Sequence, residues 1–351
     1  LDSIAKQGGG LVDVYKAVFH TSRVSPNLIA LNDTRFFAGK KTVTISNVGM
    51  KTQKYTLSHA PAGTLSTIDT STNLWNAYPV PISNAPAKVT FSTKSVTISP
   101  GQSKSFTVTF SAPSGLDPNT VPVYSGYIKL DSDSSPMRGS LSIPYLGVAD
   151  DTYNQKILDT TDYVAGVPLP ALVDASGNVV TDDQQTFTLA GSDVPGLAFR
   201  LRWGTAIEAI DLVFANTTFK PTVPINDPSE SANRRRDGLE KVVRRHNEIH
   251  SPLHDHHARA ASLQYADVKT VGNVGIGQWV PRDTVASVPS IPMTSTVYVN
   301  NGTTAQTGQD GQYKLLLRVK KQFHTYGPES SYESYLSHTF TVQGSQQVQL
   351  Q

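Results

Sequence analysis

Apolar and polar residues alternate in short runs between residues 21 and 150. In one run, Phe106, Val108 and Phe110 share a face and the residues between them are threonines. Such alternation is typical of a half-buried strand, and closely spaced strands indicate an antiparallel sandwich. The expected strands are 41–49, 51–58, 95–98, 105–110, 124–130 and 140–146.

The second part of the chain, residues 151–351, shows the same kind of pattern and predicts a second β-sandwich. Its expected strands are 186–189, 198–203, 209–214, 295–299 and 311–319. Abundant Thr, Ser, Val, Gly and Pro also favour β-structure. We therefore expect an all-β chain with two fibronectin III- or Ig-like sandwich domains.

A helical pattern precedes these strands, in the first twenty residues. After the glycines at positions 8–10, Leu11, Val14, Tyr15 and Val18 fall at i, i+3, i+4 and i+7, which predicts one apolar stripe of a short helix. The stripe needs a partner core that the following strands do not continue. Without that partner it should leave an exposed apolar patch, and removal of residues 1–20 should then improve solubility.

Residues 226–262 interrupt the β pattern with a basic stretch that holds five of the nine histidines. Within it, Leu239, Val242, Val243, His246 and Ile249 predict one side of a helix. The segment is either an insertion in a surface loop or an intron retained in the gene sequence.

Composition narrows the function classes. The chain has 351 residues, a net charge of +2 and no cysteine, which excludes disulfides and cysteine-ligated zinc. No run of about 18 apolar residues occurs, so we expect no membrane-spanning helix. No signal peptide is present, but the chain begins with Leu1 rather than Met, and we interpret it as the C-terminal piece of a longer protein.

Several motifs, in a constant order, resemble those of fungal-type subtilisin-like serine proteases (subtilases). A Gln-Gly-rich turn resembles the entry into the last helix of the catalytic domain, and five further motifs resemble the fibronectin type III-like domain that follows it. These motifs lie at 7–10, 24–33, 43–49, 98–103, 124–128 and 143–148.

The resemblance extends to the second domain. Residues 199–213 are similar to a pair of family strands, and residues 311–318 with 332–337 resemble the family's closing pattern. Two departures, Tyr335 for Trp and His338 for Pro, should preserve the strand.

The resemblance implies three segments: 1–20 as the C-terminal helix of a catalytic domain, 21–150 as the fibronectin type III-like sandwich, and 151–351 as the second sandwich. The parent enzyme would hydrolyse peptide bonds with a Ser-His-Asp triad. The Asp, His and nucleophile motifs of that triad are absent from this chain. We therefore assign no catalytic residue and no cofactor, and expect the chain alone to be inactive.

The expected function is that of a secreted, extracellular accessory region, with association with the cell wall or membrane left open. Its partners would be the catalytic domain in cis and, through the parent enzyme, protein substrates. Two alternatives remain open: a stand-alone extracellular binding or adhesion module, and a truncated gene sequence without activity.

Three sequons for N-glycosylation accord with secretion: Asn32, Asn216 and Asn301, each followed two residues later by Thr.

A histidine pair in the basic stretch has the spacing of a zinc site, since His246 and His250 lie four residues apart. In a metalloprotease the glutamate that acts as base directly follows the first histidine. Glu248 lies one residue later than that, two residues after His246 and about 200° round the helix from that histidine. We interpret the cluster as a solvated loop and assign no metal.

Arginine runs at 234–236 and 244–245 raise two further hypotheses, nucleic-acid binding and dibasic processing. Acidic residues are interspersed and no aromatic residue is interleaved, so we expect no nucleic-acid partner. Processing at these dibasic positions remains a hypothesis.

Two aspartates and three tryptophans elsewhere in the chain could serve either binding or the fold itself. Asp131 and Asp133 could help to bind calcium but are ordinary turn formers. Trp75, Trp203 and Trp279 could form a platform for a carbohydrate or a protein partner, but such residues are more often core or half-core aromatics. We expect the turn for the aspartates and the core for Trp203.

Overall fold

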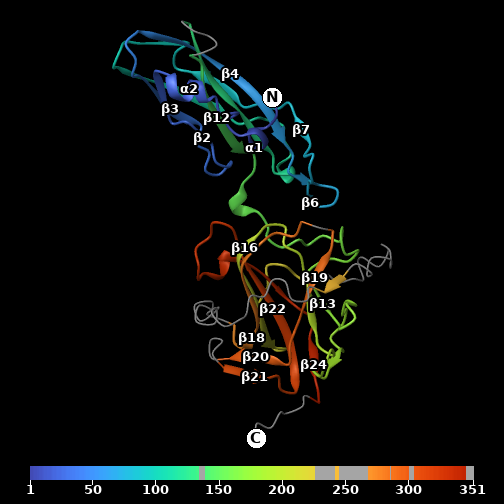
Figure 1. The fold of residues 1–351 in the computed structure, drawn as a ribbon. Coiled ribbons are helices and arrows are strands. Elements are labelled where there is room, and N and C mark those ends of the chain that lie inside the picture. The colour runs from blue at the N-terminus through green and yellow to red at the C-terminus, as the bar shows by residue number, and fades with distance from the viewer. Residues whose placement is uncertain (134–138, 226–241, 245–267, 285, 300–303, 345–351) are drawn as a thin grey trace. The chain divides into compact units, whose positions relative to one another are not determined.

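The computed structural model describes residues 1–133, 139–225, 242–244, 268–284, 286–299 and 304–344. It divides into two compact units (Figure 1), one containing Leu1–Thr70 and Trp75–Thr152 and the other Ser71–Leu74 and Tyr153–Gln351. Each unit is nearly all β. Among the described residues, no helix combines the length and apolarity needed to cross a bilayer.

The first unit is a sandwich of two sheets. One sheet has the order β1 (Ser22–Ser25), β3 (Lys40–Asn47), β10 (Ser103–Ser111) and β8 (Lys88–Phe91). The other has the order β2 (Ile29–Ala30), β12 (Leu141–Val148), β11 (Val123–Ser132), β4 (Gln53–Leu65) and β7 (Ile82–Ser83), with β9 (Ser95–Ile98) also paired with β4. The strand pairs are antiparallel except β2 with β12. The 3-10 helix η1 spans Pro118–Thr120, and two short strands, β5 (Ile68–Asp69) and β6 (Leu74–Trp75), pair with each other outside these sheets.

The core of this unit lies between its two sheets. Phe106, Val108 and Phe110 of β10 are buried, as their alternation predicts, and they belong to one cluster with Tyr55 of β4 and Ile128 of β11. All six strands expected in this region form, five of them within two residues of their expected bounds, whereas the strand expected at 51–58 extends to Leu65. The prediction of an antiparallel sandwich is therefore confirmed.

Two of the family-like motifs have a direct packing reason. Gly126 of β11 is paired with Tyr145 of β12, and Tyr124 is paired with Gly147. A Cβ at either glycine would overlap the tyrosine ring that lies across it. Both rings are fully buried, and burial raises the pKa of Tyr124 to about 12. The glycines thus make room for two core tyrosines, which explains the motifs as structural ones.

A third motif closes the turn between β3 and β4. The Asn47 side chain donates to the carbonyls of Lys51 and Ile98, at 2.8 and 3.1 Å, and accepts from the Gly49 N–H at 3.0 Å. Asn47 is 1% exposed, so these bonds satisfy a buried amide.

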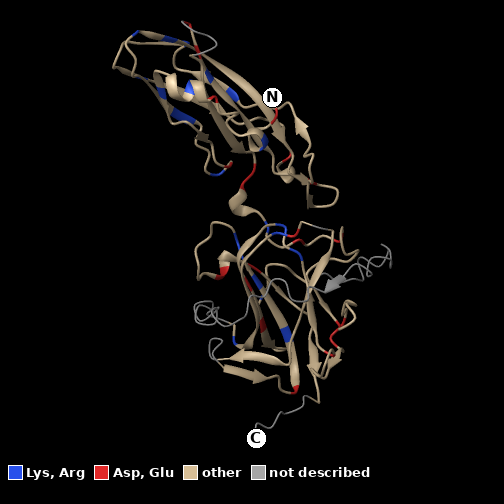
Figure 2. Cartoon of the chain, in the orientation of Figure 1, with Lys and Arg blue, Asp and Glu red and all other residues tan. Residues whose placement is uncertain are grey.

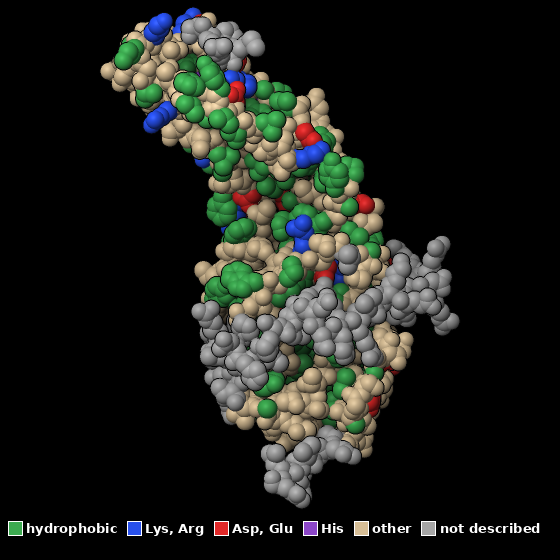
Figure 3. Space-filling view, in the orientation of Figure 1, with side chains coloured by type: hydrophobic (Ala, Val, Ile, Leu, Met, Phe, Trp, Pro, Cys, Tyr) green, Lys and Arg blue, Asp and Glu red, His purple; other side chains and the backbone are tan. Residues whose placement is uncertain are grey.

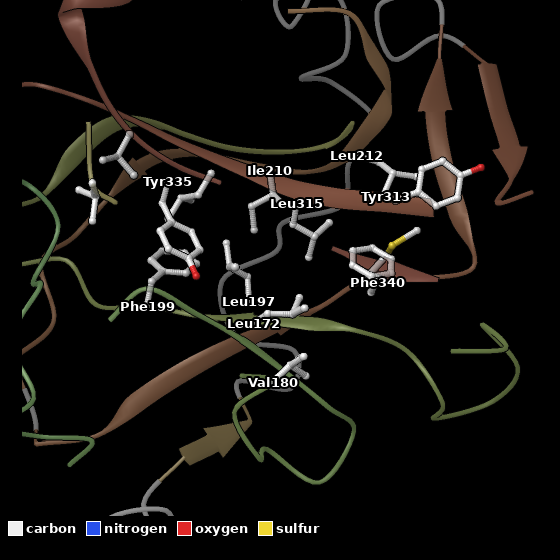
Figure 4. Packing of buried hydrophobic residues seen from close by; sticks show 14 of the residues in the cluster. Leu172, Val180, Leu197, Phe199, Ile210, Leu212, Tyr313, Leu315, Tyr335 and Phe340 are labelled. Carbon is white, nitrogen blue, oxygen red and sulfur yellow. The ribbon is translucent and has the colours of Figure 1, made fainter. Parts of the chain in front are cut away.

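The second unit also contains two sheets. The smaller sheet has the order β13 (Ala171–Val173), β15 (Gly196–Ala198), β19 (Val288–Pro292) and β17 (Val242–Arg244). The larger has the order β14 (Thr186–Phe187), β24 (Phe340–Val342), β22 (Gly311–Lys320), β16 (Thr205–Phe214), β18 (Thr270–Val280), β20 (Thr296–Val299) and β21 (Thr304–Thr307), with β23 (Tyr332–Leu336) paired with β22. The described residues also form the 3-10 helices η2 (Thr152–Asn154) and η6 (Glu329–Ser331). Leu172 and Leu197 of the smaller sheet pack toward Ile210 and Leu315 of the larger one (Figure 4), which confirms the predicted sandwich.

Three sequence predictions need correction. The N-terminal helix α2 spans Val14–Phe19 and excludes Leu11, because the Asp13 carboxylate accepts from the Lys16 N–H and starts the helix there. Another short helix, α1 (Ile4–Gln7), was not expected. The strand expected at 198–203 ends at Ala198.

The helix predicted around 239–249 also does not form where the chain is described. Residues Val242–Arg244 are a strand, β17, in parallel register with Val288–Ser290. The rest of that stretch lies outside the described residues. Two consecutive valines, Val242 and Val243, suit a strand as well as a helix. The pairing with β19 decides between the two structures.

Strand β18 has no counterpart among the expected strands, because Gly272, Gly275 and Gly277 make its sequence read as a turn. Two of these glycines have packing roles. A Cβ at Gly272 would press on Val297 of β20, and one at Gly277 would overlap Val280. Close neighbours therefore require glycine inside a strand where propensity alone disfavours it.

Candidate interaction surface

The first eight residues lie against the outer face of the sheet that contains β4 and β11. Ile4 is 7% exposed and packs with Ala62 and Tyr127 in a small apolar cluster, with Ala60 beside it. We call Leu1–Gly8 the docked segment. The docked segment covers an apolar area of the sheet that would otherwise be exposed to water. Burial of this area stabilises the folded first unit.

Hydrogen bonds fix the docked segment in one register. The Ser125 hydroxyl accepts from the Ile4 N–H at 3.1 Å and donates to the Gly63 carbonyl at 3.2 Å. The Gly63 N–H donates to the Leu1 carbonyl at 3.1 Å. At the other end, the Tyr127 hydroxyl donates to the Gly8 carbonyl at 2.9 Å. The bonds span the whole segment, so it is an integral part of the first unit.

The next eleven residues have the opposite character. No residue of α2 is buried, and Val14, Tyr15 and Val18 are 71%, 54% and 68% exposed. The side chains of Leu11, Val12 and Phe19 are exposed as well. We call residues 9–19 the bare segment. In Figure 3, hydrophobic side chains gather on the visible face of the first unit, where α2 lies.

The bare segment is nevertheless held at both ends. Asp13 caps α2 at its start, and the Tyr15 and Phe19 rings lie 4.7 Å apart between centroids. After the helix, the Nδ1 atom of His20 lies 3.1 Å from the Ser22 nitrogen and 2.9 Å from the Ser22 carbonyl oxygen, and its Nε2 atom lies 3.0 Å from the Gly139 carbonyl oxygen. The helix is anchored while its apolar side chains stay in solvent.

An exposed turn adjoins this segment. The Val48 N–H donates to the Thr21 carbonyl at 2.8 Å, which ties the β3–β4 turn to the chain just after α2. Val48 and Met50 are both exposed there. Exposed apolar side chains on a folded unit are typical of an interaction site, so the bare segment and this turn are the candidate surface.

Of the three sequons, two lie in described residues. Asn32 follows β2, has a φ of 62° and donates through Nδ2 to the Phe36 carbonyl at 3.1 Å. Asn216 is exposed in the turn after β16. Asn301 lies outside the described residues.

The aspartates considered for calcium bind across strands instead. Asp131 lies within β11 rather than in a turn, and its carboxylate accepts from the Ser58 hydroxyl at 3.3 Å. Asp133 forms an ion pair with Lys54 at 2.8 Å and accepts from Thr56 at 3.0 Å. The lysine bond lowers the pKa of Asp133. Within the described part of the chain, no group of three or more potential ligands gathers as a metal site would require.

The three tryptophans do not share one exposed surface. Trp203 packs against the core of the second unit, as expected, whereas Trp279 is 77% exposed and Trp75 is half-buried in β6.

His246, His250 and the arginines at 234–236 and 245 lie outside the described residues, and only the backbone of Arg244 is described. Figure 2 shows basic and acidic residues distributed over both units.

Buried charges in the second unit were not expected from the sequence. Asp211 of β16 and Arg318 of β22 form a buried ion pair, and Asn273 donates to the same carboxylate at 2.9 Å. Glu333, the second residue of β23, accepts from the N–H groups of Ile157 and Leu158, both at 2.9 Å. Burial raises the pKa of Glu333 against the opposing effect of these bonds. The only sequence signal is a charged residue within an otherwise apolar or aromatic strand.

The departures from the family pattern preserve the strand, as predicted. Tyr335 lies buried in β23, and His338 follows the strand, with Nδ1 3.3 Å from the Asp183 carboxylate.

Comparison with known proteins identifies one domain. Residues 29–146 match the family model of the Fn3-like domain. No curated protein matches the chain. Among solved structures, a PapD-like domain of human CEP192 is 16% identical and has a TM-score of 0.28, over 37% of this chain and 84% of that one. The CupB2 chaperone of Pseudomonas aeruginosa is 8% identical and has a TM-score of 0.24, over 90% and 98%.

Proposed function

We propose that this chain is the non-catalytic accessory region of a secreted subtilisin-like serine endopeptidase. The Fn3-like domain at residues 29–146 is of a kind found after subtilase catalytic domains. The family-like motifs of the second unit agree with this assignment.

The observation that carries the proposal is the bare segment directly before the Fn3-like domain. An anchored helix with Val14, Tyr15, Val18 and Phe19 in solvent needs an apolar partner. The bare segment follows the docked segment directly, so a catalytic domain that precedes Leu1 in the same polypeptide would lie close to it in sequence and could cover it. The docked segment would then connect that domain rigidly to the sandwich.

In this arrangement the accessory region acts by position rather than by chemistry. The first unit would brace the catalytic domain, and both units would shape the access of protein substrates. Peptide-bond hydrolysis belongs to the parent enzyme, whose triad would lie upstream of Leu1. The region would work in the extracellular space.

An alternative is a stand-alone extracellular binding module. It is favoured by exposed aromatic side chains on the second unit, namely Trp279 and Phe323, which are 77% and 71% exposed. A binding module needs no catalytic motifs upstream, so the two proposals differ in a feature that can be measured.

The deciding experiment reads the native transcript upstream of Leu1 and probes the native polypeptide with a serine-reactive fluorophosphonate. The protease proposal expects in-frame Asp, His and nucleophile motifs, and a labelled band larger than 37.9 kDa that an antiserum against residues 21–150 detects. A transcript without these motifs, or an unlabelled native polypeptide, contradicts it.

A further inference from the structure

Strand β16 ends in a turn that carries an exposed sequon beside an exposed aromatic ring. The turn is closed by the Thr217 N–H, which donates to the Phe214 carbonyl at 3.0 Å, and the Ala215 N–H donates to the Gln312 carbonyl at 3.1 Å. Asn216 occupies the third position of this turn and is exposed. In the described part of the chain no hydrogen bond engages its side-chain amide.

Phe214 is held in place by its cross-strand neighbour. Its ring is stacked on that of Tyr313, with centroids 6.0 Å apart and planes at 28°, and Tyr313 is buried. Phe214 itself remains 42% exposed. A ring ordered in advance on one side and open on the other can bind a ligand without a further loss of side-chain entropy.

A hollow of about 640 Å³ lies at this turn. Phe214, Asn216 and Thr218 all line it, together with Lys269 and Gln312. The sequon asparagine, its hydroxyl residue and the aromatic ring two positions earlier therefore border one space. Neither other sequon has an aromatic residue at that position, since Ala30 precedes Asn32 and Val299 precedes Asn301.

We propose that Asn216 is an N-glycosylation site whose first sugar packs on Phe214 and stabilises the second unit. The sugar's C–H groups would meet the electron-rich face of the ring, while Lys269 and Gln312 offer polar partners to its hydroxyl and acetamido groups. The inference rests on the secreted location in the proposed function and adds a site and a role.

The modification itself needs a lipid-pyrophosphate-linked oligosaccharide as donor. The Asn216 amide nitrogen forms a bond to the anomeric carbon of the first sugar, and the lipid pyrophosphate leaves with the electron pair of the broken bond. One amide proton is released to base. The secretory pathway supplies this donor, and the sequon supplies the acceptor.

The test uses the full chain, secreted from yeast, with Asn32→Gln and Asn301→Gln so that one sequon remains. Mass spectrometry measures occupancy at Asn216, and thermal unfolding compares the glycan trimmed to its first sugar with the Asn216→Gln variant. We expect occupancy and a rise of about 1–4 °C in the unfolding midpoint of the second unit.

The same comparison is then made with Phe214→Ala and Phe214→Leu, where at least half of the rise should disappear. Phe323→Ala, which removes another exposed phenylalanine of the same unit, is the matched control and should keep the full rise. An empty Asn216, or an equal rise without the Phe214 ring, overturns the proposal. Because the host supplies secretion, either failure leaves the protease proposal to its own test.

Discussion

The docked and bare segments are neighbours in sequence and opposites in structure. Ile4 is almost fully buried against Ala62 and Tyr127, whereas Val14, Tyr15 and Val18 lie in solvent on a capped helix. The docked segment is the more polar of the two, with Asp2, Lys6 and Gln7 among its eight residues, so hydrophobicity alone does not decide which segment is buried. The difference teaches that Leu1–Gly8 belongs to the sandwich, while residues 9–19 present a surface for something else.

The largest expected effect comes from emptying the docked site. Ile4→Ala should lower the free energy of unfolding of the first unit by about 2 kcal/mol, because it leaves a void above Ala62 and Tyr127. Val14→Ala, the matched change in the bare segment, should alter it by no more than about 0.5 kcal/mol. Denaturant titration of both variants checks the contrast, and equal losses would contradict it.

This contrast bears on an expectation drawn from the sequence, which stays a prediction. Removal of residues 1–20 was expected to improve solubility, but it would strip Ile4 from its site and expose the sheet beneath. Removal of the apolar side chains of the bare segment alone leaves the docked segment in place.

A smaller effect should follow from one hydrogen bond. Tyr127→Phe removes the bond to the Gly8 carbonyl and should cost about 1 kcal/mol at neutral pH. Tyr15→Phe is its control, since Tyr15 lies in the exposed helix, and it should cost nearly nothing. The prediction fails if the two variants unfold alike.

The cost of Tyr127→Phe should also depend on pH. Burial raises the pKa of the Tyr127 phenol, so the folded unit keeps the proton that the unfolded chain loses near pH 10. The contribution of Tyr127 is complete below that pH and is lost as the pH rises through the folded pKa. The stability gap between wild type and Tyr127→Phe should narrow as the pH rises above about 10; a gap that widens would refute the assignment.

Alternation predicted the first unit well, because strands such as β3 and β10 have one buried and one solvated face. The second unit was predicted less completely. Its strand β18 contains three glycines, and close neighbours rather than strand propensity account for two of them, Gly272 and Gly277. The Asp211–Arg318 pair and the Glu333 contacts depend on residues more than a hundred positions apart, which no local pattern encodes.

The candidate surface was predicted in part. The apolar stripe was recognised, and its exposure agrees with the expectation that it lacks a partner here. The docked segment was missed, because one buried isoleucine after a capping serine gives no periodicity. Only the sheet beneath Ile4, formed by residues some 60 and 120 positions away, makes that segment part of the fold.

The smallest expected effect on stability is that of the bare segment itself. Replacing Val14, Tyr15, Val18 and Phe19 by Ser should change the free energy of unfolding by less than the Ile4→Ala variant does, at most about 1 kcal/mol. It should, however, reduce self-association of the chain, measured by sedimentation velocity. Unchanged self-association would show that these four side chains do not drive it.

The central claim is that the bare segment is covered by a catalytic domain in the native polypeptide. Carbene footprinting measures the accessibility of individual side chains and can compare that polypeptide with residues 1–351 alone. Labelling at Val14, Tyr15, Val18 and Phe19 should fall strongly in the native polypeptide, while labelling at exposed Phe323 of the second unit serves as the reference. Equal labelling of the four side chains in both forms would contradict the account.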